Sequence, residues 1–326
     1  MIDFASLKKI IDEHNSFLLS THVNPDADAL GSQLGFYLIL KKLGKNVRVI
    51  NHSATPYNLE FLDQDNVIEK FDETVHKNVF NESEVFVLLD LNQGNRIVSM
   101  EKGLRAFKGL KVCIDHHQDT ENLFDSVFGG IEYSATSEII YDFIEETKIV
   151  ELDYAIALQL YSGIMTDTGS FRFDRTSPRI HRIMAELLEK GVSPTDVYDK
   201  IYDQFKFGRV KLLGEALSSI QLDSTQKIAY MVVRRQQLNQ NDATEADIDG
   251  FVNYCLTIQG VQIGIFFYEL KDGIKVSFRS KGEIPVNKLA KEFNGGGHTN
   301  ASGIRLFNTT VEDVKEKIIS AAQRYL

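Results

Sequence analysis

Aspartate and histidine side chains form four separated clusters within the first 167 residues of the 326-residue chain. In chain order, the clusters are His22 to Asp28, then Asp90, then the triplet Asp115-His116-His117, and finally Asp167. Carboxylate oxygens and imidazole nitrogens without thiolates suit Mn²⁺, Mg²⁺ or Fe²⁺ better than a structural zinc ion. The residue types therefore predict a site for divalent cations.

The first three clusters each lie at the end of a stretch that we expect to be a buried β-strand. Near-continuous apolar runs at 17–22, 85–90 and 110–115 are typical of parallel strands that are covered on both faces. In open α/β sheets, ligands bind outside the carboxyl ends of the strands. We therefore expect a convergent group, and its members are His22, Asp26, Asp28, Asp90, His116 and His117, with Asp167 at the end of a predicted helix.

The number of candidate ligands predicts two cations rather than one. Four aspartates contribute to the group, namely Asp26, Asp28, Asp90 and Asp167. Packed together without cations, these carboxylates would have strongly raised pKa values. Two divalent cations, about 3.5–4 Å apart, would cancel the four charges and allow a phosphate anion to bind. We expect Asp90 to bridge the cations and Asp115 to orient His116 or His117. Any one of these aspartates, taken alone, is more often a turn or capping residue.

A second group of residues in the last third of the chain predicts an anion site. The run Gly295-Gly296-Gly297-His298 follows a predicted helix, and glycines let backbone N–H groups approach an anion closely. Upstream, Arg279, Ser280 and Lys281 end a predicted strand. Together these residues suit a phosphate or nucleotide clamp. The alternative is a flexible glycine turn beside a solvated basic pair.

The periodicity of the chain predicts the α/β class with two domains. A doubly wound, mainly parallel sheet is expected over residues 1–190, a helical linker over 191–222 and a smaller α/β domain over 223–326. The expected helices of the first domain are 29–43, 135–146, 154–165 and 178–190, and 197–219 also has a helical pattern. In the second domain we expect strands at 227–233, 261–270 and 274–279 and helices at 245–256, 286–293 and 311–325.

The composition narrows the classes of function. Hydrophobic residues make up 43% and charged residues 25% of the chain, as in globular proteins. The net charge is −10, which argues against a long nucleic-acid duplex as the main partner. No apolar run is long enough to span a membrane and the two cysteines are too few for a disulfide framework, so we expect a cytoplasmic protein without a membrane partner. The sequence leaves a homodimer open.

The ordered clusters resemble the DHH phosphoesterase superfamily, whose name is the triplet found here as Asp115-His116-His117. The run Gly295–His298 resembles the signature of the DHHA1 substrate-binding domain. The pairing of the two and the chain length are similar to the NrnA-like branch, bacterial oligoribonucleases that also act as 3′-phosphoadenosine-5′-phosphate (pAp) phosphatases. The resemblance spans nearly the whole chain and implies a catalytic DHH domain followed by a DHHA1 domain.

The resemblance implies a role for each position. His22 and Asp26 would bind one metal and Asp28 and His116 the other, with Asp90 as the bridge and Asp167 as a further ligand. His117 would contact the substrate phosphate or the attacking water, so that His117, Asp90 and Asp115 form the catalytic group. The residues expected to hold the rest of the substrate are Arg279, Ser280, Gly295, Gly296, Gly297 and His298. Family members are generally Mn²⁺-dependent, and Mg²⁺ and Fe²⁺ are the alternatives.

The expected function is two-metal hydrolysis of phosphoesters. The expected substrates are short oligoribonucleotides (nanoRNA), cleaved from an end, and the nucleotide bisphosphate pAp, converted to AMP. Two alternatives keep the metal centre and change the substrate to polyphosphate or pyrophosphate, or to a cyclic dinucleotide. A third is a nucleotide-binding regulatory module without catalysis. Motifs of P-loop, Rossmann, serine-hydrolase and zincin proteins are absent from the sequence.

Overall fold

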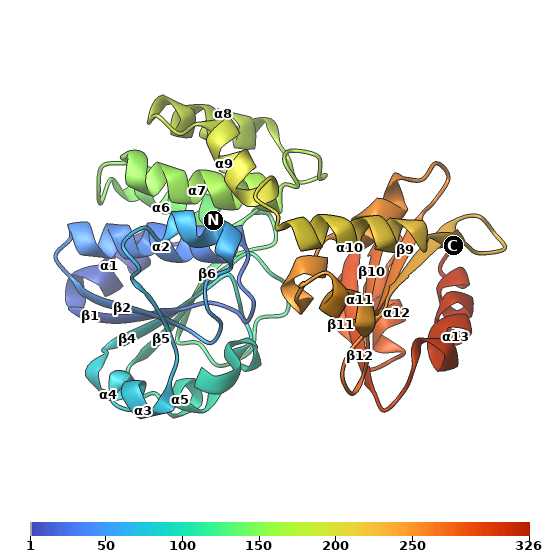
Figure 1. Cartoon of the computed structure of the whole chain (residues 1–326). Coiled ribbons are helices and arrows are strands. Elements are labelled where there is room, and N and C mark those ends of the chain that lie inside the picture. The colour runs from blue at the N-terminus through green and yellow to red at the C-terminus, as the bar shows by residue number, and fades with distance from the viewer. Residues whose placement is uncertain (1) are drawn as a thin grey trace. The chain divides into compact units, whose positions relative to one another are not determined.

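The computed structural model describes residues 2–326, which fold into two compact units (Figure 1). The first unit extends to Gln204, and the second is Phe205–Leu326. The division falls inside the segment 191–222, for which the sequence predicts a helical linker. Residue 1, with which the predicted first domain begins, lies outside the described residues.

The N-terminal unit is built on a six-stranded sheet in which every pairing is parallel. Its strands are β1 (Ser16–Ser20), β2 (Asn46–Asn51), β3 (Ile68–Lys70), β4 (Val85–Leu89), β5 (Leu110–Asp115) and β6 (Ser126–Gly129). Their spatial order is β3-β2-β1-β4-β5-β6. The predicted doubly wound, mainly parallel sheet is therefore confirmed. The edge strands β3 and β6 were not expected, because they are short and only partly buried.

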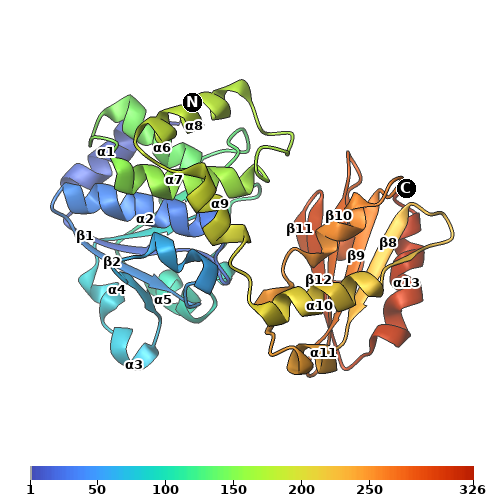
Figure 2. The same ribbon diagram turned by 45° about the horizontal axis from the view of Figure 1, so that its top comes forward.

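Helices cover both faces of this sheet (Figures 1 and 2). One face carries α1 (Phe4–Glu13), α2 (Ala27–Lys42), α6 (Thr136–Thr147), α7 (Tyr154–Asp167), α8 (Pro178–Glu189) and α9 (Pro194–Tyr202), and the other carries α3 (Glu73–His76), α4 (Val79–Glu82) and α5 (Glu101–Ala106). In β1, Phe17 and Leu19 enter the larger core while Leu18 enters the smaller one. Burial on both sides explains why these strands have continuous apolar runs rather than alternating ones.

The strand order reverses direction at β1. The chain runs outward from β1 through β2 to β3, returns to place β4 on the other side of β1, and continues outward to β5 and β6. Loops that leave neighbouring strands on either side of such a reversal diverge, and ligands bind there in doubly wound folds. His22 follows β1 and Asp90 follows β4, so these two residues belong to the loops at the reversal.

Helices α2 and α7 approach each other closely because glycines lie where they meet. A Cβ atom added at Gly31 would lie 2.4 Å from the carbonyl oxygen of Gln159. A Cβ atom added at Gly163 would lie 2.6 Å from Oδ1 of Asp28. Asp167 is about one turn beyond Gly163 on α7. The close packing of these two helices therefore sets the position of Asp167 relative to Asp28.

The C-terminal unit contains a second six-stranded sheet, which is mostly antiparallel. Its strands are β7 (Gln221–Leu222), β8 (Ile228–Val233), β9 (Ile263–Glu269), β10 (Gly273–Ser280), β11 (Gly296–His298) and β12 (Ala301–Phe307), in the order β11-β12-β10-β9-β8-β7. One face packs against α12 (Val286–Lys291) and α13 (Val311–Gln323), and the other packs against α10 (Phe207–Ser218) and α11 (Arg235–Gln240). The predicted smaller α/β domain is confirmed.

Two helix predictions are wrong in detail. The segment 245–256 forms two 3₁₀ turns, Glu245–Ile248 and Phe251–Thr257, because the chain breaks at Gly250, whose φ is 80°. The segment 197–219 is not one helix but belongs to α9 and α10. The buried face of α9 packs into the core of the first unit and that of α10 into the core of the second, so the helical pattern is interrupted between them.

The glycine run is only partly a loop. Gly296, Gly297 and His298 form the edge strand β11, which pairs with β12. A Cβ atom at Gly297 would lie 2.5 Å from the carbonyl oxygen of Ala301, and the φ of Gly297 is 136°. The close pairing of the two strands therefore requires glycine at this position.

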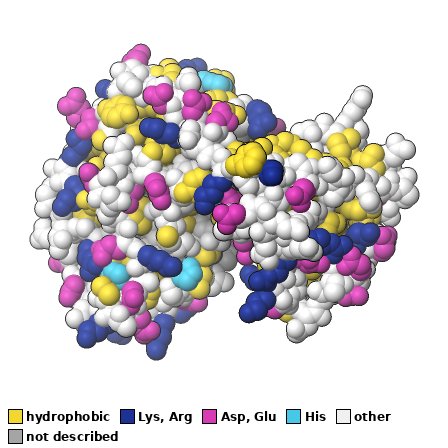
Figure 3. Space-filling model, in the orientation of Figure 1, with side chains coloured by type: hydrophobic (Ala, Val, Ile, Leu, Met, Phe, Trp, Pro, Cys, Tyr) yellow, Lys and Arg dark blue, Asp and Glu magenta, His cyan; other side chains and the backbone are white. Residues whose placement is uncertain are grey.

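Two observations concern the molecular surface. Within residues 2–326, every helix is too short or too polar to cross a membrane. On the face of the N-terminal unit shown in Figure 3, acidic and basic side chains are interspersed rather than separated into large fields of one sign.

We expect the substitution Gly31→Ala to destabilise the N-terminal unit by about 1–3 kcal/mol, because the new methyl group would collide with the backbone of α7. Gly35→Ala on the same helix is the matched control, since its Cβ atom meets only the movable side chain of Leu160 at 3.0 Å. Calorimetric melting curves should show a clearly larger loss for Gly31→Ala. Equal melting temperatures for the two variants would contradict the packing that we describe.

Candidate metal centre

The structure brings the predicted ligands from five segments to one place at the carboxyl edge of the parallel sheet. Three histidines and five aspartates lie there, namely His22, Asp26, Asp28, Asp90, Asp115, His116, His117 and Asp167. They come from the loops after β1, β4 and β5, from the start of α2 and from the end of α7. Most are buried; the side chain of Asp26 is 59% exposed and marks the open side of the group.

Asp90 occupies the middle of the group. Its Oδ2 lies 3.4 Å from Nε2 of His22, and its Oδ1 lies 3.5 Å from Nε2 of His116. Oδ1 also accepts a hydrogen bond of 2.9 Å from the hydroxyl of Thr136. The backbone of Asp90 has a φ of 59°, in the left-handed region that aspartate tolerates better than most residues. The two oxygens of this carboxylate thus face two different histidines.

The potential ligands fall into sets of three whose ligand atoms lie within 4.8 Å of one another. One set is His22, Asp26 and Asp90, another is Asp28, His116 and Asp167, and a third combines Asp90 with His116 and His117. The first two sets have no member in common. Asp90 belongs to the first set and lies beside the second, as a bridging ligand must.

Backbone carbonyls fix which nitrogen of two histidines faces the carboxylates. Nδ1 of His22 lies 3.0 Å from the carbonyl oxygen of Val23, and Nδ1 of His116 lies 3.4 Å from that of Tyr133. Because a carbonyl only accepts hydrogen bonds, each Nδ1 carries the proton in these contacts. In the neutral imidazoles, the Nε2 atoms therefore turn their lone pairs toward Asp90 and Asp167, which is the form in which histidine binds a metal. In the protonated form, Nε2 of His22 instead donates to Asp90.

Asp115 orients His117 rather than His116. Its Oδ1 lies 2.6 Å from Nδ1 of His117, and its Oδ2 accepts a hydrogen bond of 3.1 Å from the backbone N–H of the same residue. These two contacts fix the tautomer and the direction of the ring. The structure thus distinguishes between the two partners that the sequence allowed for Asp115.

Asp28 and Asp26 are both held by helix N-termini. Asp26 is the N-cap of α2, where its Oδ1 accepts the backbone N–H groups of Asp28 and Ala29 and its Oδ2 faces His22. Asp28 accepts the backbone N–H groups of Thr136 (2.7 Å) and Ser137, at the start of α6. The N-cap of α6 is an alanine that cannot cap the helix, so Asp28 takes this role.

Burial and mutual repulsion dominate the titration of the aspartates. Burial, followed by the charge of Asp90, raises the pKa of Asp28 well above its usual value. Burial, followed by the charge of Asp28, raises the pKa of Asp167 in the same way. For Asp90, burial acts upward too, but the hydrogen bond with His22 and the neighbouring imidazoles outweigh it and lower the pKa. Divalent cations would relieve this repulsion, so the donor set and its charge fit a metal centre.

A buried polar network supports His116 from behind. The backbone N–H and the hydroxyl of Ser134 donate to Glu138, at 2.8 and 2.9 Å. Glu138 is in turn paired with Arg179 of α8. This network fixes the turn that presents the carbonyl oxygen of Tyr133 to His116. These residues and Thr136 were not among the predicted site residues. The polar stretch at 134–138, directly before an apolar helical pattern, is the signal that could have identified them.

In the C-terminal unit, two of the predicted substrate residues share one face of the sheet. His298 pairs with Ala301 across β11 and β12, and Ala301 pairs with Arg279 across β12 and β10. Directly opposed residues point to the same face of a sheet. Arg279 and His298, both potential hydrogen-bond donors, therefore lie in one row with the small Ala301 between them. Ser280, in contrast, uses its hydroxyl to donate to Ile284, at 2.6 Å, and points to the other face.

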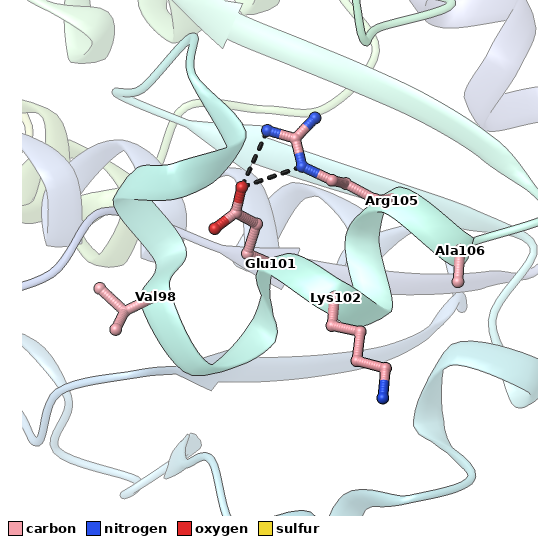
Figure 4. A pocket seen from close by; sticks show the side chains of 5 residues that line it. All are labelled: Val98, Glu101, Lys102, Arg105 and Ala106. Atoms are coloured by element: carbon pink, nitrogen blue, oxygen red, sulfur yellow. Dashed lines mark hydrogen bonds and ion pairs between the residues drawn. The ribbon is translucent and has the colours of Figure 1, made fainter.

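A shallow hollow beside α5 differs from the group of candidate metal ligands in the residues that line it. It is lined by Val98, Glu101, Lys102, Arg105 and Ala106 (Figure 4). Its only acidic side chain, Glu101, forms an ion pair of 2.8 Å with Arg105. These five residues therefore offer no set of metal ligands.

Comparisons with known proteins confirm the resemblance that the motifs indicate. The model of the DHH family N-terminal domain matches residues 16–164, and the model of the DHHA1 domain matches residues 225–326. A Thermus thermophilus protein named bifunctional oligoribonuclease and PAP phosphatase NrnA is 30% identical over 309 residues, which are 94% of this chain and 89% of that protein.

Solved structures agree with this result. The crystal structure of an exopolyphosphatase-related protein from Bacteroides fragilis matches with a TM-score of 0.93 and 33% identity, over 99% of this chain and 96% of that chain. RecJ from Thermus thermophilus, solved in complex with Mn²⁺, has a TM-score of 0.57 and 12% identity, over 99% of this chain and 55% of that chain. The latter similarity shows a shared fold.

Without cations, the raised pKa of Asp167 should make the protein less stable as the pH rises from about 3.8, the ordinary value for aspartate. The folded state resists ionisation of this carboxyl, so stability is lost until the pH exceeds the raised pKa. In EDTA, we therefore expect the melting temperature of Asp167→Asn minus that of the unsubstituted protein to increase as the pH rises.

Saturating Mn²⁺ provides the control for this prediction. At neutral pH, Mn²⁺ should make the unsubstituted protein the more stable of the two, because Asp167→Asn would lack one of the candidate ligands. A difference in melting temperature that stays constant from pH 4 to pH 8 in EDTA would contradict the electrostatic account.

Proposed function

The chain belongs to the DHH phosphoesterase family, and from this premise we propose that it is a two-metal phosphoesterase that hydrolyses short oligoribonucleotides and pAp. The relative named NrnA carries both activities in its name. We further propose that Mn²⁺ is the preferred cation, that Mg²⁺ or Fe²⁺ can replace it, and that the protein acts in the cytoplasm.

The position of Asp90 between two sets of ligands carries this proposal. Its two oxygens face His22 on one side and His116 on the other. In the proposed site, His22 and Asp26 would hold one cation, Asp28, His116 and Asp167 would hold the other, and Asp90 would contact both.

Divalent cations in such a site supply Lewis-acid chemistry, in that they activate water for attack on phosphorus and stabilise negative charge on the phosphoryl oxygens. The protein supplies orientation. His117, held by Asp115 at 2.6 Å, is the side chain that we assign to the substrate phosphate or the attacking water. The tautomer fixed by Asp115 keeps Nδ1 protonated, so that Nε2 is the atom for that contact.

We assign recognition of the rest of the substrate to the C-terminal unit. Arg279 and His298 share one face of its sheet with the small Ala301 between them, and we assign this face to a phosphate or sugar of the substrate. Gly295, Gly296 and Gly297 provide backbone close to the same edge. Ser280 supports the loop instead, because its hydroxyl is bonded to Ile284.

Polyphosphate is the second candidate substrate, because the solved relative from Bacteroides fragilis is named exopolyphosphatase-related. Nucleotides remain the first candidate, since two relatives that match more than nine tenths of this chain are both named bifunctional oligoribonuclease and PAP phosphatase. A panel of short RNA, pAp, a cyclic dinucleotide, polyphosphate and pyrophosphate, each with Mn²⁺, separates the candidates.

Asp90→Ala should lower kcat/KM for the preferred substrate by more than about 100-fold. Replacing a residue that only orients a metal ligand lowers activity by about 100-fold at most, so a larger loss indicates that Asp90 itself binds the metal. The circular dichroism spectrum should stay unchanged, because the variant loses one charge from a repulsive group. Asp12→Ala on the exposed side of α1 is the matched control and should keep full activity. An Asp90→Ala variant with near-normal turnover would remove Asp90 from the site.

His298→Ala should raise KM for pAp and RNA at least about tenfold with little change in kcat, because a hydrogen bond to a charged group contributes about 1.5–3 kcal/mol. Lys288→Ala on α12, which covers the opposite face of the sheet, is the control. An unchanged KM in His298→Ala would show that the glycine run has only a structural role.

A further inference from the structure

Directly after Asp167, the chain forms a turn of unusual backbone geometry. Gly169, Ser170 and Phe171 have φ values of 59°, 55° and 67° in succession. Such values cost little for glycine, but about 1–3 kcal/mol for a residue such as phenylalanine. The structure must therefore stabilise this turn by its contacts.

Hydrogen bonds back to α7 provide that stabilisation. The carbonyl oxygen of Thr168 accepts the N–H groups of Arg172 and Phe173, both at 3.0 Å, and the carbonyl oxygen of Met165 accepts that of Ser170 at 2.8 Å. The ring of Phe171 packs into the core, 5.4 Å from the ring of His181. The turn is therefore a fixed extension of the helix that carries Asp167.

The side chain of Phe173, unlike that of Phe171, is largely in the solvent, with 57% of its surface exposed. Its ring lies over Gly169, where an added Cβ atom would be 2.5 Å from the ring. Contact with Gly169 fixes one part of the ring, while the exposed part offers an aromatic surface to the solvent.

The same turn is tied to the metal centre. Arg175 donates a hydrogen bond of 3.2 Å to the carbonyl oxygen of Tyr133, the atom that orients His116. Asp167, two residues before Gly169, lies 3.2 Å from Nε2 of His116. Phe173 therefore lies on a rigid segment that is anchored at both ends beside these two candidate ligands.

We propose that Phe173 is a stacking platform for the nucleobase of the nucleotide whose phosphate occupies the metal centre. This inference rests on the proposed function. Every base has a π-face, so stacking favours nucleotides over inorganic phosphates without selecting one base. The exposed arginines of the turn, Arg172 and Arg175, add positive charge that suits a phosphorylated ligand.

Fluorescence tests the platform without relying on catalysis, because the chain contains no tryptophan. In Phe173→Trp with Mg²⁺, AMP should quench the emission and ribose 5-phosphate should not. Tyr154→Trp is the matched control, since Tyr154 is 52% exposed at the far end of α7, a helix about 20 Å long, and AMP should leave its emission unchanged. Equal quenching by both ligands, or no quenching by AMP, overturns the proposal.

Kinetics provides the second test. Phe173→Leu should raise KM for a ribodinucleotide at least about fivefold, while Tyr154→Leu should not. With a substrate that has an abasic terminal residue, the unsubstituted protein and Phe173→Leu should have the same KM. If KM of Phe173→Leu is still about fivefold higher than KM of the unsubstituted protein on the abasic substrate, Phe173 does not act by stacking on the base. If the unsubstituted protein cleaves no nucleotide, the proposed function fails, while the fluorescence experiment still decides the role of Phe173.

Discussion

The structure of the N-terminal unit depends on the accommodation of buried negative charge. Asp28, Asp90 and Asp167 lie close enough for burial and mutual repulsion to raise the pKa of two of them well above normal. Two features of the chain offset this repulsion, namely the N-terminus of α6 and the imidazoles around Asp90, and bound divalent cations would offset it further. A fold that had only to be stable would place leucine in such positions, so the charged group indicates selection for chemistry.

The same constraint explains the packing around the site. Gly31 and Gly163 let α2 and α7 approach until Asp28 and Asp167 face one group of histidines. Four of the candidate ligands are also held by a second contact: Asp26 caps its own helix, His22 and His116 donate to carbonyl oxygens, and His117 is bonded to Asp115. Rigid ligands limit the reorganisation needed when cations and substrate bind, which is how metal sites gain affinity and catalytic power.

Much of this arrangement could be predicted from the sequence, because the decisive signals are local. Strands buried on both faces have continuous apolar runs, and residues at their carboxyl ends must meet at one edge. The supporting contacts leave no such signal. Tyr133 acts through its backbone carbonyl, and Glu138 pairs with Arg179, 41 residues away. The strand β12 was missed because Ala301, Ser302 and Gly303 hide its alternating pattern of burial.

The central claim, that this group of residues holds a pair of divalent cations, is tested most directly by anomalous diffraction from crystals soaked in Mn²⁺. The account predicts two anomalous peaks per chain. One should lie among His22, Asp26 and Asp90, and the other among Asp28, His116 and Asp167. A single peak at saturating Mn²⁺, or peaks that lie away from Asp90, would contradict the two-metal centre.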